Sequence, residues 1–315
     1  MSTPIAVVAG VDISKDHLDV AIYPSGAARR FVNDRKGHTA LLRWIAPLIV
    51  ERIVFEATGP YHRLFETRIG QLGIPFAKVN PRHARRFAEA TGKLTKTDRV
   101  DAAMLARFGA LLEPACRPLR SPTLDQLAEI VAARRALVRD RTATINRSKT
   151  LTIKLLKRLA ANRLLQIDRQ IDALDAEARA LVSADTSLAR RLVILATMPG
   201  IGEATAIALI ANMPELGEID AKQAAALAGL APIARQSGNW RGKSSIRGGR
   251  SHLRQALYMP ALVAARFNPD LKKSYDSFIA AGKPPKVAIT AVMRKLIVLA
   301  NALIRDDRPW TKSIA

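Results

Sequence analysis

Residues 5–23 read IAVVAGVDISKDHLDVAIY, and this stretch decides how the N-terminal part of the chain folds. Two runs rich in valine, isoleucine and alanine, residues 5–13 and 18–23, flank a short polar segment. This pattern predicts two adjacent β-strands joined by a turn through Ser14, Lys15 and Asp16. Asp12 lies at the end of the first strand, where a carboxylate interrupts an otherwise apolar run, and is the first candidate functional residue.

The same mixture of strands and helices continues to about residue 112. Residues 28–32, 52–56 and 75–79 are further candidate strands, and helical patterns occupy residues 39–49, 61–72 and 98–112. Strands that alternate with helices predict a mixed sheet covered by helices. We therefore expect residues 1–118 to form an α/β domain.

Helical periodicity replaces this alternation from Pro122 onward. Residues 124–159 contain no glycine or proline, and residues 164–181 carry apolar side chains at spacings of three and four. This pattern predicts a helical hairpin or coiled-coil arm over residues 119–185. After a break near residues 183–187, we expect a mainly α-helical C-terminal domain over residues 186–315.

A large positive charge dominates the composition of the 315-residue chain, with a net charge of +23 and a pI of about 11. Such a surplus usually has a polyanion as its partner, and nucleic acid is the first candidate. No uninterrupted apolar run reaches membrane-spanning length and no signal peptide is evident, so we expect a cytoplasmic, nucleoid-associated protein. The single cysteine, Cys116, excludes an internal disulfide, fits a reducing cytosol and removes zinc-finger spacings from consideration.

Four carboxylates form the main candidate site. Glu56 ends a later predicted strand, as Asp12 does, and strand ends at one edge of a sheet can converge. Asp98 and Asp101 are three residues apart and share one face of a predicted helix. These groups repel one another unless a divalent cation compensates them, and Mg²⁺ or Mn²⁺ can then promote phosphodiester chemistry. Taken singly, each has an ordinary alternative as a helix cap, a strand end or a solvated surface acid.

A second candidate site lies in a basic segment, because no acidic residue occurs between Asp220 and Asp270. Guanidinium groups there would stabilise both a serine alkoxide and a nearby phosphate, which suits attack on phosphorus. From the residues alone, an ordinary turn explains Ser237 and Gly238 better than a nucleophile does, and three further serines share the segment: Ser244, Ser245 and Ser251. Its candidate nucleic-acid ligands are Arg235, Arg241, Lys243, Arg247, Arg250 and Arg254.

Three further features predict contacts with a nucleic-acid backbone. Residues 199–202 resemble a helix-hairpin-helix turn in which the amides of Gly200 and Gly202 meet a phosphate, although a plain helix connection is the ordinary alternative. The predicted arm is strongly basic, as is a cluster ahead of the Asp98 helix. The candidate residues are Arg134, Arg135, Arg139 and Lys149 on the arm, and Arg82, Arg85 and Arg86 in the cluster.

Several motifs resemble those of the IS110 family of insertion-sequence transposases, and within it the IS1111 branch. They are VDISK at residues 11–15, EATG at 56–59, VNP at 79–81, KTDRVDA at 96–102, and the serine-glycine pair at 237–238. The match extends along essentially the whole chain, and the family is related to the Piv-type DNA invertases. The resemblance implies a RuvC-like domain of the RNase H fold, with a DEDD metal site at Asp12, Glu56, Asp98 and Asp101.

The resemblance also implies an activity. Family members cut and rejoin DNA with this metal site and a serine, here Ser237, and use a structured bridge RNA to pair with target and donor DNA. The arm would mediate formation of a dimer or tetramer, so that Ser237 of one protomer completes the carboxylate site of another. We therefore expect a Mg²⁺-dependent transposase or recombinase.

Three alternatives stay open. A RuvC-like endonuclease would hydrolyse DNA with an activated water and would need no serine. A nucleotide-binding protein of the actin/hexokinase type fits residues 10–12, but no second motif for adenosine is found. A non-catalytic nucleic-acid-binding protein descended from a transposase is the third alternative, which the intact carboxylates argue against.

Overall fold

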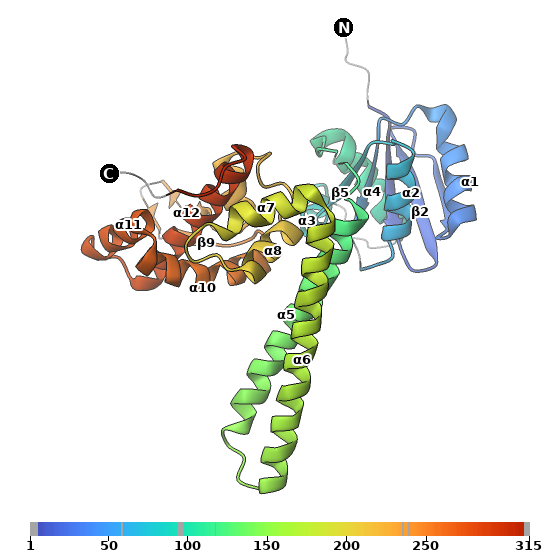
Figure 1. The fold of residues 1–315 in the computed structure, drawn as a ribbon. Helices are drawn as coiled ribbons and strands as arrows, with labels where there is room; N and C mark the ends of the chain where they lie inside the picture. The colour runs from blue at the N-terminus through green and yellow to red at the C-terminus, as the bar shows by residue number, and fades with distance from the viewer. Residues whose placement is uncertain are drawn as a thin grey trace. The chain divides into compact units, whose positions relative to one another are not determined.

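The computed structural model of the chain describes residues 6–57, 59–92, 98–116, 118–234, 236–238, 240–242 and 244–311, with the side chains of residues 98, 99 and 240 left out. The chain divides into two compact units, Met1–Arg120 and Ser121–Ala315 (Figure 1). This division places the helical hairpin in the same unit as the C-terminal helices.

The N-terminal unit contains a five-stranded sheet with the strand order β3-β2-β1-β4-β5. The strands are β1 (Val8–Ile13), β2 (His17–Tyr23), β3 (Ala28–Val32), β4 (Arg52–Glu56) and β5 (Phe76–Val79). The first three pair antiparallel, whereas β4 is parallel to β1 and β5 is parallel to β4. The prediction of a mixed α/β unit is confirmed.

Helices cover both faces of this sheet. They are α1 (Arg35–Ile45), the short helix η1 (Ala46–Leu48), α2 (Arg63–Gln71), α3 (Pro81–Ala90) and α4 (Asp98–Leu112). Val11 and Phe55 pack in one buried cluster with residues of α1 and α2. Val8 and Val54 pack in a second cluster with residues of α4. Successive residues of β1 and β4 therefore face opposite helical layers.

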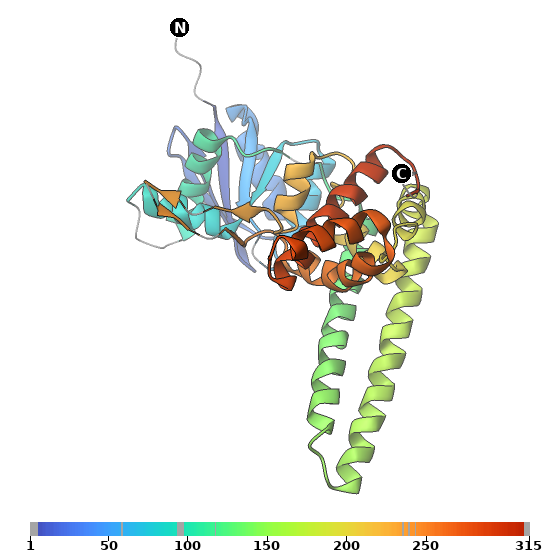
Figure 2. The same ribbon diagram turned by 90° about the vertical axis from the view of Figure 1, so that its left-hand side faces the viewer.

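The C-terminal unit begins with a hairpin of two long helices, α5 (Pro122–Ser148) and α6 (Lys154–Ala184), which run side by side (Figures 1 and 2). The position predicted for the connection, between residues 159 and 164, is wrong. α5 ends at Ser148, and residues 149–153 form the turn.

Local hydrogen bonds explain where the hairpin turns without glycine or proline. Ser148 Oγ donates to the carbonyl of Ile145 (2.8 Å), and Thr150 Oγ1 donates to the carbonyl of Arg147 (3.1 Å). Hydroxyls that bond to nearby carbonyls compete with helical hydrogen bonds. The β-branched residues Thr152 and Ile153 further lower the helix propensity of the turn.

Six more helices complete this unit: α7 (Thr186–Ala196), α8 (Glu203–Asn212), α9 (Ala221–Leu227), α10 (Ser251–Phe267), α11 (Pro269–Ala280) and α12 (Pro285–Arg305). They share one hydrophobic core with the base of the hairpin, where Leu127 and Val182 are fully buried. Within the described ranges, α12 alone is long and apolar enough to cross a membrane, and half of its most apolar window is buried in the protein. Core helices pass the same test, and Leu296 and Ile297 place α12 in the core.

Short strands interrupt the helices between α9 and α10. β6 (Pro232–Ile233) pairs with β9 (Ser245–Ile246), and β7 (Gln236–Ser237) pairs with β8 (Trp240–Arg241). The C-terminal part is mostly helical, as predicted, but the segment that carries Ser237 is a pair of small antiparallel ladders.

Candidate functional site

The sheet places Asp12 and Glu56 on neighbouring strands. β1 and β4 are parallel with Val11 opposite Phe55, and Asp12 and Glu56 are the next residues along each strand. Because side chains alternate along a strand, both carboxylates project on the face that α4 covers. Two residues that lie far apart in the sequence thus reach the same edge and the same face of the sheet.

Two glycines set the height of α4 above this face. A Cβ atom on Gly10 would lie 2.2 Å from the carbonyl oxygen of Ala102 and 2.2 Å from the amide nitrogen of Ala106. A Cβ atom on Gly109 would lie 2.7 Å from Val8 Cγ1. The backbones of the helix and the strand therefore touch at Gly10, Gly109 leaves room for the side chain of Val8, and residues later in α4 lie above residues earlier in β1.

This antiparallel crossing directs the first turn of α4 toward the carboxylate edge. α4 begins at Asp98, and Asp101 directly precedes Ala102, which lies above Gly10. The side chain of Asp98 lies outside the described residues. Among the side chains that are described, no three of the types Asp, Glu, His and Cys are grouped closely enough to hold a metal ion. Metal binding by the four carboxylates therefore stays a prediction.

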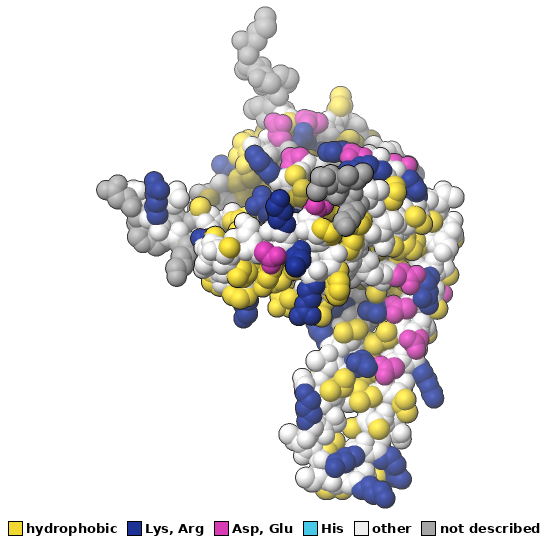
Figure 3. Space-filling model, turned by 60° about the vertical axis from the view of Figure 1, so that its left-hand side comes forward, with side chains coloured by type: hydrophobic (Ala, Val, Ile, Leu, Met, Phe, Trp, Pro, Cys, Tyr) yellow, Lys and Arg dark blue, Asp and Glu magenta, His cyan; other side chains and the backbone are white. Residues whose placement is uncertain are grey.

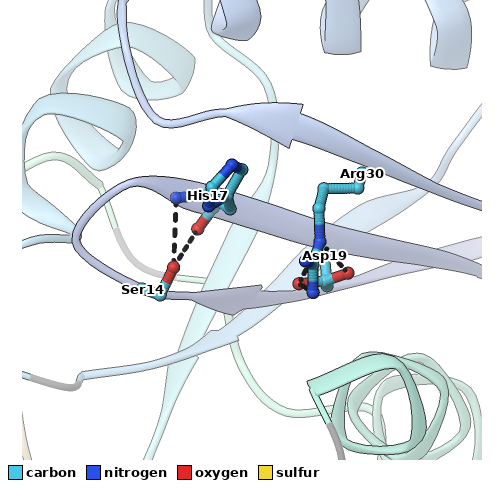
Figure 4. A network of polar contacts seen from close by, with 4 residues as sticks. All are labelled: Ser14, His17, Asp19 and Arg30. Atoms are coloured by element: carbon cyan, nitrogen blue, oxygen red, sulfur yellow. Dashed lines mark hydrogen bonds and ion pairs between the residues drawn. The ribbon is translucent and has the colours of Figure 1, made fainter.

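Asp19 adds a carboxylate that the sequence analysis missed. It lies opposite Asp12 in the pairing of β1 with β2 and is 9% exposed. Arg30 of β3 donates three hydrogen bonds to it, from Nε to Oδ1 (3.0 Å) and to Oδ2 (3.2 Å) and from Nη2 to Oδ2 (2.9 Å) (Figure 4). Like charges directly opposite each other destabilise a sheet, and the Arg30 guanidinium offsets one of the two.

Ser14 fixes the turn that follows the Asp12 strand. Its hydroxyl accepts a hydrogen bond from the amide of His17 (3.0 Å) and donates one to the carbonyl of His17 (2.9 Å) (Figure 4). A side chain that closes a turn in this way holds the ends of the two flanking strands in register. The serine of the VDISK motif, Ser14, therefore stabilises the turn between β1 and β2.

Ser237 lies at the end of β7, where it pairs with Trp240 of β8. Its side chain is exposed, and its hydroxyl makes no hydrogen bond to a described residue. The serines at positions 244, 245 and 251 are exposed as well, so exposure does not single out Ser237. The structure presents several serine hydroxyls to solvent on one basic segment.

Two of the predicted nucleic-acid-binding arginines anchor the base of this segment. Arg250 donates to both carboxylate oxygens of Glu215 (2.8 and 2.6 Å) and to the carbonyl of Asn212 (2.7 Å). Arg254 Nη1 donates to the carbonyls of Gly229 (3.0 Å) and Gly248 (3.2 Å). The sequence gives no sign of these roles, because every acceptor lies outside the basic stretch or on its backbone.

The remaining predicted nucleic-acid-binding residues of the C-terminal unit differ in their exposure. Arg241 and Arg247 are exposed, whereas Arg235 and Lys243 lie outside the described residues. Gly200 packs against α10, where a Cβ atom would lie 2.6 Å from the carbonyl oxygen of Pro260. Gly202 is exposed at the start of α8.

The acidic side chain of Glu203 occupies the first turn of α8, beside Gly202, and pairs with Arg179 (3.2 Å). A carboxylate in the first turn of a helix occupies the region of positive potential that a phosphate would use. The turn at residues 199–202 therefore connects two packed helices, and its phosphate contact stays a prediction.

The basic candidates of the hairpin are paired near its base and exposed beyond it. Arg134 forms an ion pair with Asp175 of α6, Arg135 is half-buried, and Arg139 is exposed. Lys149 donates to Asn146 (3.2 Å) and is exposed in the turn. Figure 3 shows Lys and Arg side chains gathered at this closed end, where the exposed basic residues include Arg147, Lys149, Lys154, Lys157 and Arg158.

The second basic cluster lies on α3. Arg85 pairs with Glu89 one turn later (3.1 Å), whereas Arg82 and Arg86 are exposed and form no ion pair with a described residue. Exposed, unpaired guanidinium groups are available to phosphates in a way that paired ones are not. Arg82 and Arg86 are therefore the stronger candidates of this cluster.

Comparison with known proteins identifies the group to which these features belong. A transposase family model matches residues 9–157, and a model of the transposase IS116/IS110/IS902 family matches residues 192–276. The pilin gene-inverting protein of Moraxella bovis is 32% identical, over 97% of this chain and 98% of that protein. The insertion element IS110 43.6 kDa protein of Streptomyces coelicolor is 30% identical, over 49% of this chain and 38% of that protein.

Proposed function

Because the chain belongs to the IS110 family of transposases, we propose that it cuts and rejoins DNA strands with the edge carboxylates and Ser237. Membership of this family implies a DNA-cleaving recombinase. The observation that carries the proposal is the convergence of Asp12, Glu56 and the first turn of α4 on one edge and one face of the sheet. This placement supports a RuvC-like domain of the RNase H fold.

The residues proposed to hold the metal are Asp12, Glu56, Asp98 and Asp101. Their oxygen donors suit Mg²⁺ or Mn²⁺. When bound, the ion would supply Lewis-acid stabilisation of charge at phosphorus. The proposal requires the Asp98 side chain to point to the same edge as Asp101, one helical turn away.

Ser237 is proposed as the nucleophile. Its Oγ attacks phosphorus in one DNA strand as the hydroxyl proton passes to a base. The bond from phosphorus to the departing strand breaks, and the released oxygen takes up a proton. The other strand end stays joined to Ser237 as a phosphate ester. A hydroxyl of the partner strand then attacks this ester, forms the new phosphodiester and returns a proton to Oγ, so the number of phosphodiester bonds is conserved.

We further infer that the protein acts as a dimer or tetramer with a structured guide RNA, and that its hairpin is a coiled-coil arm. Exposed basic side chains at the closed end of the hairpin support binding to a nucleic-acid backbone. Exposed apolar side chains at the same end, Ile153, Leu155 and Leu159, are 60, 51 and 53% exposed and support contact with a second copy. Ser237 of one protomer would then complete the carboxylate site of another.

The decisive experiment uses a plasmid that carries the gene with its natural non-coding flanks. Rejoined DNA junctions are amplified and sequenced, and detergent-stable protein–DNA adducts are isolated from the same cells. We expect Ser237→Ala and Asp12→Ala each to abolish junctions, and Ser237→Ala to abolish adducts. Ser244→Ala, a matched change in the same segment, should leave both unchanged.

Strand cleavage by Ser237→Ala at the normal rate would instead establish the rival activity, a RuvC-like endonuclease that uses activated water. Co-purified nucleic acid is sequenced in parallel. A single RNA species encoded beside the gene would support the guide, and its absence would refute it.

A further inference from the structure

Four polar residues form a row across the sheet on the side that faces α4. In strand order, on β3, β2, β1 and β4, the row consists of Arg30, Asp19, Asp12 and Glu56. Asp19 lies opposite Arg30 in one pairing and opposite Asp12 in the next. Its neighbours Leu18 and Val20 pack on the other face, in the cluster with α1 and α2. Asp19 and Arg30 therefore extend the row of proposed metal ligands by two strands.

Arg30 holds the carboxylate of Asp19 from the side of β3, which is the side away from Asp12. The Nε and Nη2 atoms of Arg30 donate to both carboxylate oxygens, at 2.9 to 3.2 Å (Figure 4). Hydrogen bonds of this forked, charge-assisted kind fix the geometry of a carboxylate. Among the described side chains, Asp12, Asp19 and Glu56 are not grouped closely enough to hold a metal ion together. Asp19 is thus placed beside the proposed ligands but is not one of them.

The two members of this ion pair differ in their exposure to water. The side chain of Asp19 is 12% exposed, whereas that of Arg30 is 54% exposed. Water and salt therefore screen the guanidinium charge more strongly than the sheltered carboxylate charge. The carboxylate is also one strand closer to Asp12, and residues directly opposite each other have Cβ atoms about 5 Å apart. At the carboxylate edge the pair acts mainly as a negative charge, although its formal charges cancel.

We propose that Asp19 is a positioning residue of the carboxylate edge, which attracts the divalent cation to Asp12 without binding the ion itself. Arg30 holds Asp19 in that place and limits the attraction through its own positive charge. This inference rests on the proposed metal site. Removal of a group that surrounds the ligands of a metal typically changes the affinity for the ion by about 10–100-fold. Removing the charge of Asp19 and removing that of Arg30 should therefore shift the affinity in opposite directions.

The test is calorimetric titration of the full-length protein with Mn²⁺ in the absence of DNA. Asp19→Asn keeps the size of the side chain and removes its charge, so the affinity for Mn²⁺ should fall roughly tenfold. Arg30→Gln removes the opposing charge and should raise the affinity about threefold, a smaller change because water screens the guanidinium. A defect in the fold of the sheet would lower the affinity in both variants, so the opposite signs distinguish positioning from a structural role.

Two neighbouring charges provide matched controls. Arg29 precedes Arg30 on β3 and lies on the other face of the sheet, where its guanidinium carbon is 5.4 Å from the centre of the Phe31 ring. Asp16 is exposed in the turn between β1 and β2. Arg29→Gln and Asp16→Asn change the net charge by one, as the test variants do. Because solvent screens both sites, each should keep its affinity within about twofold of the unaltered protein.

Titration of Asp12→Asn separates this inference from the proposed metal site, because that variant should lose most of the Mn²⁺ binding. Normal binding by Asp12→Asn, or no binding by the unaltered protein, would overturn the metal site and the role of Asp19 together. If Asp12→Asn loses binding while Asp19→Asn and Arg30→Gln match their controls, the metal site stands and the role of Asp19 is overturned. A lower affinity in both Asp19→Asn and Arg30→Gln would overturn it as well.

Discussion

The carboxylate edge and the Ser237 segment are held in place by different means. Asp12 and Glu56 lie at the ends of two paired strands, and α4 packs over the same face of the sheet, with its backbone against that of Gly10 and with Gly109 against the side chains of Val8 and Val54. Ser237 lies in a ladder of two residues on each strand, and the ion pair of Arg250 with Glu215 anchors only the base of its segment. The packed sheet and helix α4 hold the carboxylate edge in place, whereas the Ser237 segment depends on a short ladder and a few polar contacts.

The largest effect expected from this difference is a separation of activity from stability at the carboxylate edge. Asp12→Asn should lower the rate of junction formation roughly 10³-fold, because it removes a charge from the proposed metal site. The strand ladder does not depend on that charge, so the melting temperature should change by only a few degrees. Asp16→Asn, in the exposed turn, is the control and should retain activity. Full activity in Asp12→Asn would remove this residue from the site.

Gly10→Val tests whether the close contact between the backbones of β1 and α4 stabilises the carboxylate edge. A side chain there meets the backbone of α4 at 2.2 Å, so the helix must move away from the sheet. We expect a loss of about 3 kcal/mol in the free energy of unfolding, the upper end of the usual cost of overpacking. Chemical denaturation measures it, with Gly202→Ala, where a Cβ meets nothing within 4 Å, for comparison. Similar stabilities of the two variants would contradict the close packing.

Arg250→Gln tests the anchoring of the serine segment. It leaves the partly buried carboxylate of Glu215 without its guanidinium partner and should cost about 2 kcal/mol of stability. Recombination should fall as well, because the segment that carries Ser237 loses the contact of Arg250 with Glu215 at its base. Arg247→Gln, an exposed change in the same segment, should leave stability unaltered. If Arg250→Gln is as stable as the unaltered protein, the anchor has no energetic role.

Acidification should produce the smallest effect. Burial lowers the pKa of His38, His62 and His252 below the ordinary value of 6.5. Between the folded and unfolded pKa values the unfolded chain binds more protons, so stability is complete above pH 6.5 and is lost as the pH falls through this window. Melting temperatures at pH 7.5 and 5.5 should therefore differ by a few degrees, with the lower value in acid. An unchanged or higher value in acid would contradict the burial of these rings.

The sequence predicts the sheet well because alternation and strand length are local signals. Asp19 was missed because its position beside Asp12 depends on the register in which the strands pair. Only the pairing of β1 with β2 reveals that it lies opposite Asp12, and only β3 reveals its partner Arg30. The hairpin turn was misplaced because hydroxyl groups, rather than glycine or proline, end the first helix.

The predicted nucleic-acid ligands show a similar limit. A run of basic residues predicts a charged surface, but it does not say which arginines the protein itself uses. Arg250 and Glu215 are 35 residues apart, and Arg134 and Asp175 are 41 apart. Such pairs form through tertiary packing, and no local pattern marks them.

The hairpin has a consequence for engineering. The core of its unit takes in only the first turns of α5, through Leu127 and Val131, and the last turns of α6, through Ala178 and Val182. By the rise of an α-helix, the 27 residues of α5 extend about 40 Å. Most of that length does not pack in the core of the unit. Matched removal of seven residues from each helix would preserve the facing stripes and shorten the reach by about 10 Å. The arm is thus an adjustable spacer, and a series of trimmed versions would measure the distance it must bridge.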